Sequence, residues 1–427
     1  MKSELLYGRG SVTIDLPHEI EITTVHKNPM VPLEDDQQAI MHALENPVES
    51  PLLSEIGGAD KTACILICDI TRPVPNGKLL PPLIDALTAS GVQKQNMTIL
   101  IATGLHRPNE GEELLEVVGD EGIYRSIRVE NHFARDKDAH VDLGSTSSGI
   151  PVMIDRRFYE ADLKIVVGLV EPHFMAGYSG GRKLVAPGVA YQDTILNFHV
   201  ARILEHPKSA NCVVEGNPLH ESQMEIVDLI GQMMALNVVI DEERRIGFVN
   251  FGEIKASHLQ AIGFMRRYAE VSLPRRFKTV VTSSAGYPLD KTYYQTVKGM
   301  VGALDILVPG GTIIIASECS EGMGSPEFFA AQRLLYREGT ENFMAILNRR
   351  EKALIDEWQT EMLVKALNVA KIQLYTQGLN DEELKITCVE PVESLEEAIL
   401  QSTEFHQDKH IAIIREGPYV IPKFSLS

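Results

Sequence analysis

Short, uninterrupted apolar runs alternate with helical stretches early in the sequence, and this alternation constrains the fold more than any other feature. TACILIC (62–68) is followed by the helical stretch NGKLLPPLIDALTASG (76–91) and then by MTILIAT (97–103), and LKIVVGLV (163–170) is a third apolar run. Apolar runs without polar alternation are typical of parallel strands that helices cover on both faces. We therefore predict an open α/β sheet in the first half of the chain.

A second alternation begins near residue 278. KTVVTSS (278–284) precedes a predicted helix over 291–302, and GTIIIAS (311–317) follows it. The fold class that we predict is α/β: two α/β domains with mainly parallel sheets and the active site in the cleft between them. We assign residues 1–268 to the N-terminal domain and residues 269–427 to the C-terminal domain, whose last strands could pack back on the first domain.

Composition limits the kinds of molecule that the chain is expected to bind. The chain has 40 basic and 59 acidic side chains, a net charge of −19, and no basic run, which argues against a nucleic-acid surface. The first residues lack the apolar segment of a signal peptide, and no uncharged apolar span of 18 residues occurs. We therefore predict a cytoplasmic protein with no membrane partner. The five cysteines form no CxxC pair, so neither a disulfide framework nor a zinc ribbon is predicted, and a small-molecule site remains.

Unusual polar loops follow three of the predicted strands. DITRPVP follows the strand that ends at Cys68, TGLHRP the strand that ends near Ala102, and EPHFMAGYSGGRK the strand that ends at Val170. In an open parallel sheet the carboxyl ends of the strands meet at one edge, where ligands bind. We therefore expect one site to contain Asp69, Thr71, Arg72, His106, His173, Arg182 and Lys183.

Each of these residues also has an ordinary structural explanation. Asp69 and Thr71 could cap a turn, and Arg72 could be a solvated side chain. His106 and His173, taken singly, could be core or surface histidines without a chemical role. Their joint placement at one sheet edge favours a functional site.

The third loop contains three small residues, Ser179, Gly180 and Gly181. Consecutive backbone N–H groups in such a segment can form an anion-binding nest, to which Arg182 and Lys183 would add charge suited to a phosphate; the alternative is a plain glycine turn. The segment does not fit the G-x-x-x-x-G-K-[ST] pattern. A buried lysine beside such a nest could also bond covalently to a cofactor, because desolvation and neighbouring cations favour the free amine.

One histidine lies in the next predicted helix, QDTILNFHVARILEH (192–206). Ile195, His199 and Ile203 are spaced by four residues, so the imidazole would lie on the apolar stripe of that helix. A histidine in such a position is usually a core residue. Neutral imidazole is nevertheless the commonest metal ligand, and a helix holds it rigidly.

The second half contains a polar helix face after the turn in AGYPLDKTYYQTVKGM (285–300). The predicted helix places Gln295 and Lys298 on one face, with Tyr294 beside them. An amide and an ammonium suit a substrate with a carboxylate, although an ordinary polar helix face fits the spacing equally well.

Together, DITRPVP, TGLHRP, EPHFMAGYSGGRK, His199 and YYQTVKG resemble the lactate racemase family, whose members use a nickel-pincer nucleotide. The match keeps the family's order over residues 60–325. The resemblance implies pyridinium-3-thioamide-5-thiocarboxylic acid mononucleotide joined to Lys183, and nickel bound by a carbon, two sulfurs and His199. The N-terminal domain would then be the cofactor-binding domain. The residues that would hold the nucleotide are Asp69, Thr71, Arg72, Ser179, Gly180 and Gly181.

The resemblance also implies a reaction, the racemisation or epimerisation of a short-chain 2-hydroxy acid, with lactate or a close relative as the expected substrate. One of His106 and His173 would take the hydroxyl proton while the α-hydrogen leaves as hydride, and the hydride would return after the keto acid rotates. Separate cofactor-assembly enzymes would be required as partners. The residues that would bind the substrate are Arg72, Tyr294, Gln295 and Lys298.

Two other functions stay open. His106, His173 and His199 could form a three-histidine metal site for hydrolysis, although their spacing is not diagnostic and Lys183 would have no role. The chain could instead be a non-catalytic binder of an anionic metabolite.

Overall fold

The structure, a computed structural model, describes residues 2–425 and divides into two compact units. We call them the Lys183 unit (Pro29–Phe198 and Pro207–Arg267) and the His199 unit (Met1–Asn28, His199–His206 and Tyr268–Ser427). Each unit contains one six-stranded sheet. Both sheets are mainly parallel, which confirms the predicted fold class.

The Lys183 unit is built on a sheet of strand order β13-β12-β9-β4-β5-β6, in which only β13 is antiparallel to its neighbour. The three apolar runs of the sequence are its adjacent strands β5, β4 and β9, and their side chains are buried because helices cover the sheet. The strands are β4 (Ala63–Cys68), β5 (Met97–Ala102), β6 (Arg128–Asn131), β9 (Leu163–Leu169), β12 (Met234–Ile240) and β13 (Ile246–Glu253).

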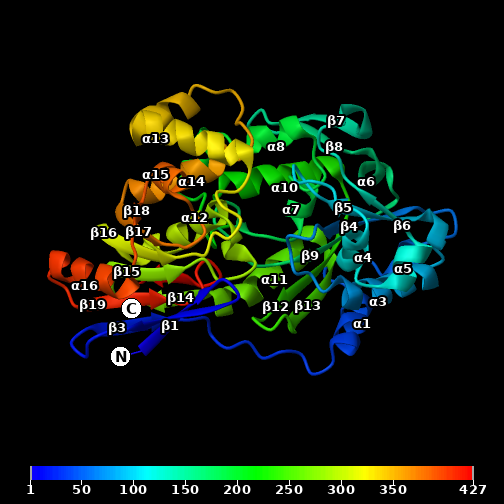
Figure 1. Ribbon diagram of the computed structural model, residues 1–427. Helices are drawn as coiled ribbons and strands as arrows, with labels where there is room; N and C mark the ends of the chain where they lie inside the picture. The colour runs from blue at the N-terminus through cyan, green and yellow to red at the C-terminus, as the bar shows by residue number, and fades with distance from the viewer. Residues whose placement is uncertain (1, 426–427) are drawn as a thin grey trace. The chain divides into compact units, whose positions relative to one another are not determined.

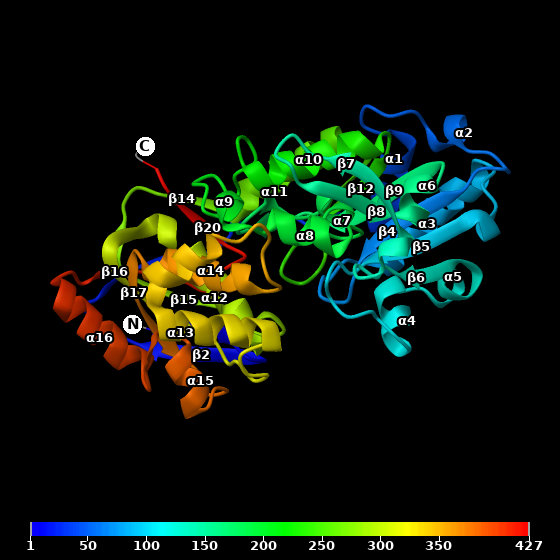
Figure 2. The same ribbon diagram turned by 90° about the horizontal axis from the view of Figure 1, so that it is seen from above.

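The helices of this unit place apolar stripes against the sheet. In α3, Leu79, Leu83 and Leu87 recur every four residues and are fully buried, as expected for an amphipathic helix. Short helices α4 and α5 lie beside β6 at the sheet edge (Figure 2). The helices are α1 (Asp36–Glu45), α2 (Leu53–Ile56), α3 (Asn76–Ala89), α4 (Glu112–Val118), α5 (Glu121–Ser126), α6 (Arg156–Glu160), α7 (Arg182–Val185), α8 (Gln192–Phe198), α10 (Pro218–Ile230) and α11 (Ile254–Ala269), and the hairpin strands are β7 (His140–Ser145), β8 (Pro151–Asp155), β10 (Pro172–His173) and β11 (Gly177–Tyr178).

The His199 unit has an entirely parallel six-stranded sheet of order β18-β17-β16-β15-β19-β3. Two pairs of shorter strands accompany it, β1 with β2 and β14 with β20. The strands are β1 (Lys2–Tyr7), β2 (Gly10–Asp15), β3 (Glu21–Val25), β14 (Glu270–Leu273), β15 (Phe277–Ser283), β16 (Leu307–Ala316), β17 (Ala370–Tyr375), β18 (Glu390–Pro391), β19 (His410–Ile414) and β20 (Ile421–Phe424). The helices are α9 (Ala201–Leu204), α12 (Tyr293–Gly302), α13 (Pro326–Leu347), α14 (Glu357–Leu367), α15 (Asp381–Ile386) and α16 (Leu395–His406).

The compact units do not follow the predicted division into residues 1–268 and 269–427. Strand β3 pairs in parallel with β19, from Glu21 opposite His410 to Val25 opposite Ile414, so the first strands join the C-terminal sheet. Figure 1 shows the blue β3 beside the red β19. Pairing between the two ends of a chain depends on tertiary structure, and local sequence patterns do not indicate it.

No helix within residues 2–425 is both long enough and apolar enough to cross a membrane.

Candidate functional site

The first two polar loops meet at the carboxyl edge of the Lys183 unit's sheet. Because β4 and β5 are parallel neighbours, the loops that follow them start side by side. Nδ1 of His106 lies 2.6 Å from Oδ2 of Asp69, and the Thr71 hydroxyl donates to Oδ1 of Asp69 at 2.5 Å. Asp69 is buried, whereas the His106 side chain is 63 % exposed. A buried carboxylate thus anchors an imidazole that remains accessible to a ligand.

The charge of Asp69 follows from these contacts. Burial opposes ionisation, but the hydrogen bonds from His106 and Thr71, together with the charges of His106 and Arg72, outweigh it and lower the pKa of Asp69. Asp69 is therefore ionised at neutral pH. Since Nδ1 of His106 faces this carboxylate, Nε2 is the nitrogen that can exchange a proton with a ligand.

An ion pair connects the first loop to the third. The guanidinium of Arg72 contacts the carboxylate of Glu171, which lies directly after β9. Both residues follow adjacent parallel strands, β4 and β9. The structure therefore brings the three predicted loops to one edge of one sheet.

Hydrogen bonds define the tautomer of His173, whose ring contacts Lys183. The backbone N–H groups of Met175 and Ala176 donate to Nδ1 of His173 at 3.2 and 3.1 Å. Nδ1 is then unprotonated, and a neutral ring has its proton on Nε2. Nε2 lies 3.1 Å from Nζ of Lys183, so the imidazole and the lysine amine are hydrogen-bond neighbours.

The small residues of the third loop have two distinct roles. The Ser179 hydroxyl donates to the carbonyl of Leu169 at 2.8 Å and accepts the N–H of Glu171 at 3.0 Å, so Ser179 closes the loop. Gly180 and Gly181 have φ values of +75° and +47°. A Cβ on Gly180 would lie 2.9 Å from the carbonyl oxygen of Leu169, and only glycine suits both the angle and the space.

Arg182 does not face the predicted site. Its side chain is only 1 % exposed and turns into the interior, where Nη2 donates to the carbonyls of Ala176 and Tyr178. The expectation that Arg182 and Lys183 both supply charge to the site was wrong for Arg182, because its guanidinium is buried and Nη2 donates within the loop.

The predicted helix over residues 192–206 is interrupted at His199. Helix α8 ends at Phe198 and α9 begins at Ala201, since Val200 has extended backbone angles, φ −77° and ψ 148°. The expected apolar stripe of Ile195, His199 and Ile203 on one helix was therefore wrong. The His199 ring instead packs against Trp358 of α14, with ring centroids 4.4 Å apart.

The predicted polar face in the C-terminal half is on helix α12, whose first turn is capped by Thr292. Nε1 of Trp358 donates to the Tyr294 hydroxyl at 3.2 Å, so Tyr294 and His199 contact the same indole ring. Burial raises the pKa of Tyr294, which keeps its hydroxyl protonated. Oε1 of Gln295 is buried and accepts no hydrogen bond within residues 2–425. Lys298 lies one turn further along α12.

The sequence patterns did not identify Trp358 as a neighbour of the candidate residues. Its position in α14 matches no motif, and the one available signal is that it is the single tryptophan of the chain.

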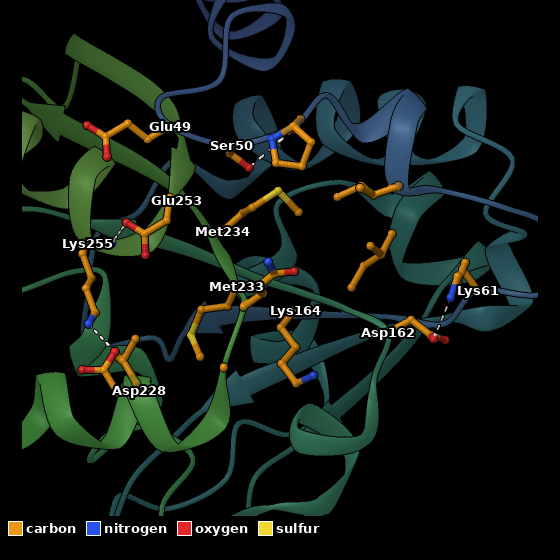
Figure 3. Close-up of a pocket in the computed structure, with 16 residues that line it drawn as sticks. Glu49, Ser50, Lys61, Asp162, Lys164, Asp228, Met233, Met234, Glu253 and Lys255 are labelled. Carbon is orange, nitrogen blue, oxygen red and sulfur yellow. Dashed lines mark hydrogen bonds and ion pairs between the residues drawn. The ribbon is translucent and has the colours of Figure 1, made fainter.

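A separate cavity of about 600 Å³ lies at the opposite, amino-terminal edge of the same sheet (Figure 3). Two ion pairs line it: Lys61 lies 3.2 Å from Asp162, and Lys255 contacts Asp228. None of the predicted site residues lines it. Because it contains none of these residues, this cavity is a weaker candidate than the loop edge.

Metal ligation offers a test of the hydrolase alternative. Across residues 2–425, no group of three or more His, Cys, Asp or Glu side chains is arranged to hold a metal ion. A three-histidine site of His106, His173 and His199 therefore has no support. A metal bound by one protein histidine and by non-protein donors does not require such a group.

Known proteins resemble the chain over almost its whole length. Residues 7–211 match the lactate racemase N-terminal domain, and residues 274–421 match the lactate racemase C-terminal domain. A lactate racemase from Thermoanaerobacterium thermosaccharolyticum is 31 % identical over 98 % of each chain. A second, from Lactiplantibacillus plantarum, is 30 % identical over 91 % of each chain.

Solved structures show the same relationship. The lactate racemase apoprotein from T. thermosaccharolyticum superposes with a TM-score of 0.91 at 30 % identity, covering 99 % of this chain and 100 % of that one. A protein from Thermotoga maritima shares the fold, with a TM-score of 0.68 at 17 % identity over 93 % of this chain and 100 % of that chain.

Proposed function

Since this chain belongs to the lactate racemase family, we propose that it is an isomerase that racemises or epimerises lactate or a closely related short-chain 2-hydroxy acid. The observation that supports this most directly is the pair of anchored imidazoles in loops at one sheet edge. His106 is held by Asp69, and His173 by two backbone N–H groups.

Two anchored histidines suit a reaction that starts from either enantiomer. Each ring is held through Nδ1, so Nε2 is the nitrogen open to the substrate. His106, with its proton on Nδ1 toward Asp69, would take the hydroxyl proton at Nε2, and His173, with its proton on Nε2, would return one. The ionised Asp69 would stabilise the imidazolium of His106 after it has accepted a proton. His106 and His173 are the proposed acid/bases, one for each face of the substrate.

The residues also fit the nickel-pincer nucleotide that the family resemblance implies. The Lys183 amine, 3.1 Å from the His173 ring, suits a covalent attachment, and the turn at Gly180 and Gly181, with φ values of +75° and +47°, suits the phosphate. The imidazole of His199 suits nickel alongside sulfur donors. When bound, this group would accept a hydride from the substrate's α-carbon and return it. Asp69, Thr71 and Arg72 would hold the nucleotide from the first loop.

Carboxylate recognition is assigned to cationic and amide side chains. Arg72 and Lys298 would bind the substrate carboxylate, since guanidinium and ammonium groups are its usual partners. Gln295, whose Oε1 accepts no hydrogen bond within residues 2–425, would bind a hydroxyl. Tyr294 would add a protonated phenol.

The test is maturation with the cofactor-assembly enzymes, followed by intact-protein mass spectrometry, nickel analysis and chiral chromatography of L-lactate. We expect an adduct on the Lys183 peptide, nickel, and formation of D-lactate. Lys183→Ala should fold and contain no adduct, and an adduct in that variant would place the attachment elsewhere. An unmodified, inactive wild type would refute the proposal, provided that the T. thermosaccharolyticum racemase matures in parallel.

The same assay can define the range of substrates. A panel of 2-hydroxy acids, analysed for inversion at the α-carbon, should show turnover of lactate and its short-chain relatives. Turnover of sugar acids alone would overturn the short-chain assignment.

A further inference from the structure

Arg182 is a buried cation that has no carboxylate partner within residues 2–425. Its side chain is 1 % exposed, and the one influence on its pKa within residues 2–425 is burial, which lowers it. Arginine nonetheless remains charged at neutral pH. A charge in such a position is costly unless hydrogen bonds offset the loss of water. Nε has no hydrogen-bond partner within residues 2–425, so the contacts of Nη1 and Nη2 indicate the role of Arg182.

The contacts of Arg182 are backbone carbonyls of the loop that contains His173. Nη2 donates to the carbonyl of Ala176 at 2.7 Å and to that of Tyr178 at 3.2 Å. Nη1 lies over the His258 ring, 3.5 Å from each ring nitrogen. The guanidinium therefore holds the inner side of this loop.

Two neutral histidines complete the buried cluster. Burial and the charge of Arg182 lower the pKa of His258 well below its ordinary value and that of His220 to about 3. Nε2 of His258 lies 2.8 Å from the carbonyl of Ser179 and donates its proton there. Arg182 and His258 together hold three carbonyls, those of Ala176, Tyr178 and Ser179.

The peptide groups of Ala176 connect this cluster to a proposed acid/base. The carbonyl of Ala176 accepts from Arg182, while the N–H of Ala176 donates to Nδ1 of His173. Arg182 thereby restrains the residue whose N–H fixes the tautomer of His173. Loss of this restraint would free the His173 ring to exchange its two neutral tautomers.

We propose that Arg182 is a positioning residue for the reaction: through Ala176 it holds His173 with Nδ1 unprotonated and the proton on Nε2, the nitrogen from which His173 would return a proton to the substrate oxygen. This inference rests on the proposed function only in its kinetic consequence. The tautomer itself is a property of the apoprotein.

The test uses the full-length chain with Arg182→Met, which removes the donors, and Arg182→Lys, which keeps the charge and one set of donors. The matched control is Arg157→Lys, because Arg157 lies in the same unit but pairs with Asp155 and Glu130. Nitrogen-15 NMR of histidine-labelled apoprotein reports the tautomer of His173, assigned by its absence in His173→Gln. Circular dichroism and urea unfolding report folding.

We expect one tautomer, with the proton on Nε2, in the wild type and in Arg157→Lys. Arg182→Met should show mixed tautomers and, in matured enzyme, a kcat about 10- to 100-fold lower with little change in KM. Arg182→Lys should recover part of the wild-type tautomer population and part of the wild-type kcat. If Arg182→Met folds and keeps the wild-type tautomer of His173 and the wild-type kcat, the inference is overturned. If Arg182→Met does not fold, the inference is overturned when Arg182→Lys has the wild-type tautomer and the wild-type kcat.

Failure of the proposed function is a different outcome. It would appear as an unmodified, inactive wild type, while the NMR comparison of wild type, Arg182→Met and Arg157→Lys would still decide the role of Arg182.

Discussion

Each unit buries a carboxyl group beside its candidate residues, and the two groups shift in opposite directions. Asp69, next to His106, has a lowered pKa, whereas Glu361, in the same helix as Trp358, has its pKa raised to about 8. Burial disfavours the charge of both. Asp69 receives hydrogen bonds from His106 and Thr71, while Glu361 has the negative charge of Glu205 nearby.

The two regions are held in place by different interactions. The candidate residues of the Lys183 unit are in loops that polar contacts and ionised groups hold in place. Those of the His199 unit are helical or packed on an aromatic ring. We therefore expect substitutions in the loops to affect chemistry, and substitutions around α14 to affect stability and its pH dependence.

The largest expected effect tests the chemistry of the loops. His106→Ala and His173→Ala should each lower the rate of racemisation about 100- to 10,000-fold, because each removes an acid/base. Binding of lactate, measured by calorimetry on matured protein, should persist. His42→Ala, at an exposed position on α1 of the same unit, is the control. Unchanged racemisation in both variants would show that neither histidine is an acid/base of the reaction.

A smaller loss is expected when the anchor of His106 is changed. Asp69→Asn should lower kcat about 100-fold, since a neutral amide cannot stabilise the imidazolium. Thr71→Val, which removes one hydrogen bond to the same carboxylate, should cost much less. Equal losses in the two variants would indicate that the loop conformation matters more than the charge.

The lowered pKa of Asp69 also predicts that the folded chain loses stability at acid pH. Its pKa is below the ordinary 3.8, so its contribution is present above pH 3.8 and is lost as the pH falls through the lowered value. Urea unfolding at pH 6 and at pH 3 should therefore show a smaller difference for Asp69→Asn than for the wild type. An identical difference would contradict the lowered pKa.

The raised pKa of Glu361 predicts that stability has the opposite dependence on pH. Its folded pKa of about 8 exceeds the ordinary 4.5, so the unfolded chain ionises first and stability falls as the pH rises from 4.5 to 8. Glu361→Gln should remove this fall and be more stable at pH 8 by about 2 to 4 kcal/mol. Glu205→Gln, which removes the neighbouring charge, should give a smaller gain. Parallel stability–pH curves for wild type and Glu361→Gln would show that Glu361 does not hold a proton.

The smallest expected effect separates aromatic packing from hydrogen bonding at Trp358. Trp358→Phe keeps a ring against His199 and loses the hydrogen bond to Tyr294, so we expect a loss of about 1 kcal/mol in the free energy of unfolding. Trp358→Ala loses the packing as well and should cost about 3 kcal/mol. Equal losses would assign the stabilisation to the hydrogen bond alone.

Much of the candidate site could be predicted because it depends on local pattern and on one rule of topology. Buried apolar runs identified β4, β5 and β9, and parallel strands have their carboxyl ends at one edge. That was sufficient to bring Asp69, His106 and Lys183 to one edge. The helix with Gln295 and Lys298 followed from its spacing and its preceding turn.

The sequence alone thus determined the α/β class, the loops and their chemical groups, because hydrophobic periodicity and turn residues act over short distances. Only the tertiary structure decided that β3 joins the C-terminal sheet, that the helix breaks at His199 beside Trp358, and that Arg182 turns inward. These features depend on partners far away in the sequence, whose packing and hydrogen bonds outweigh local preference.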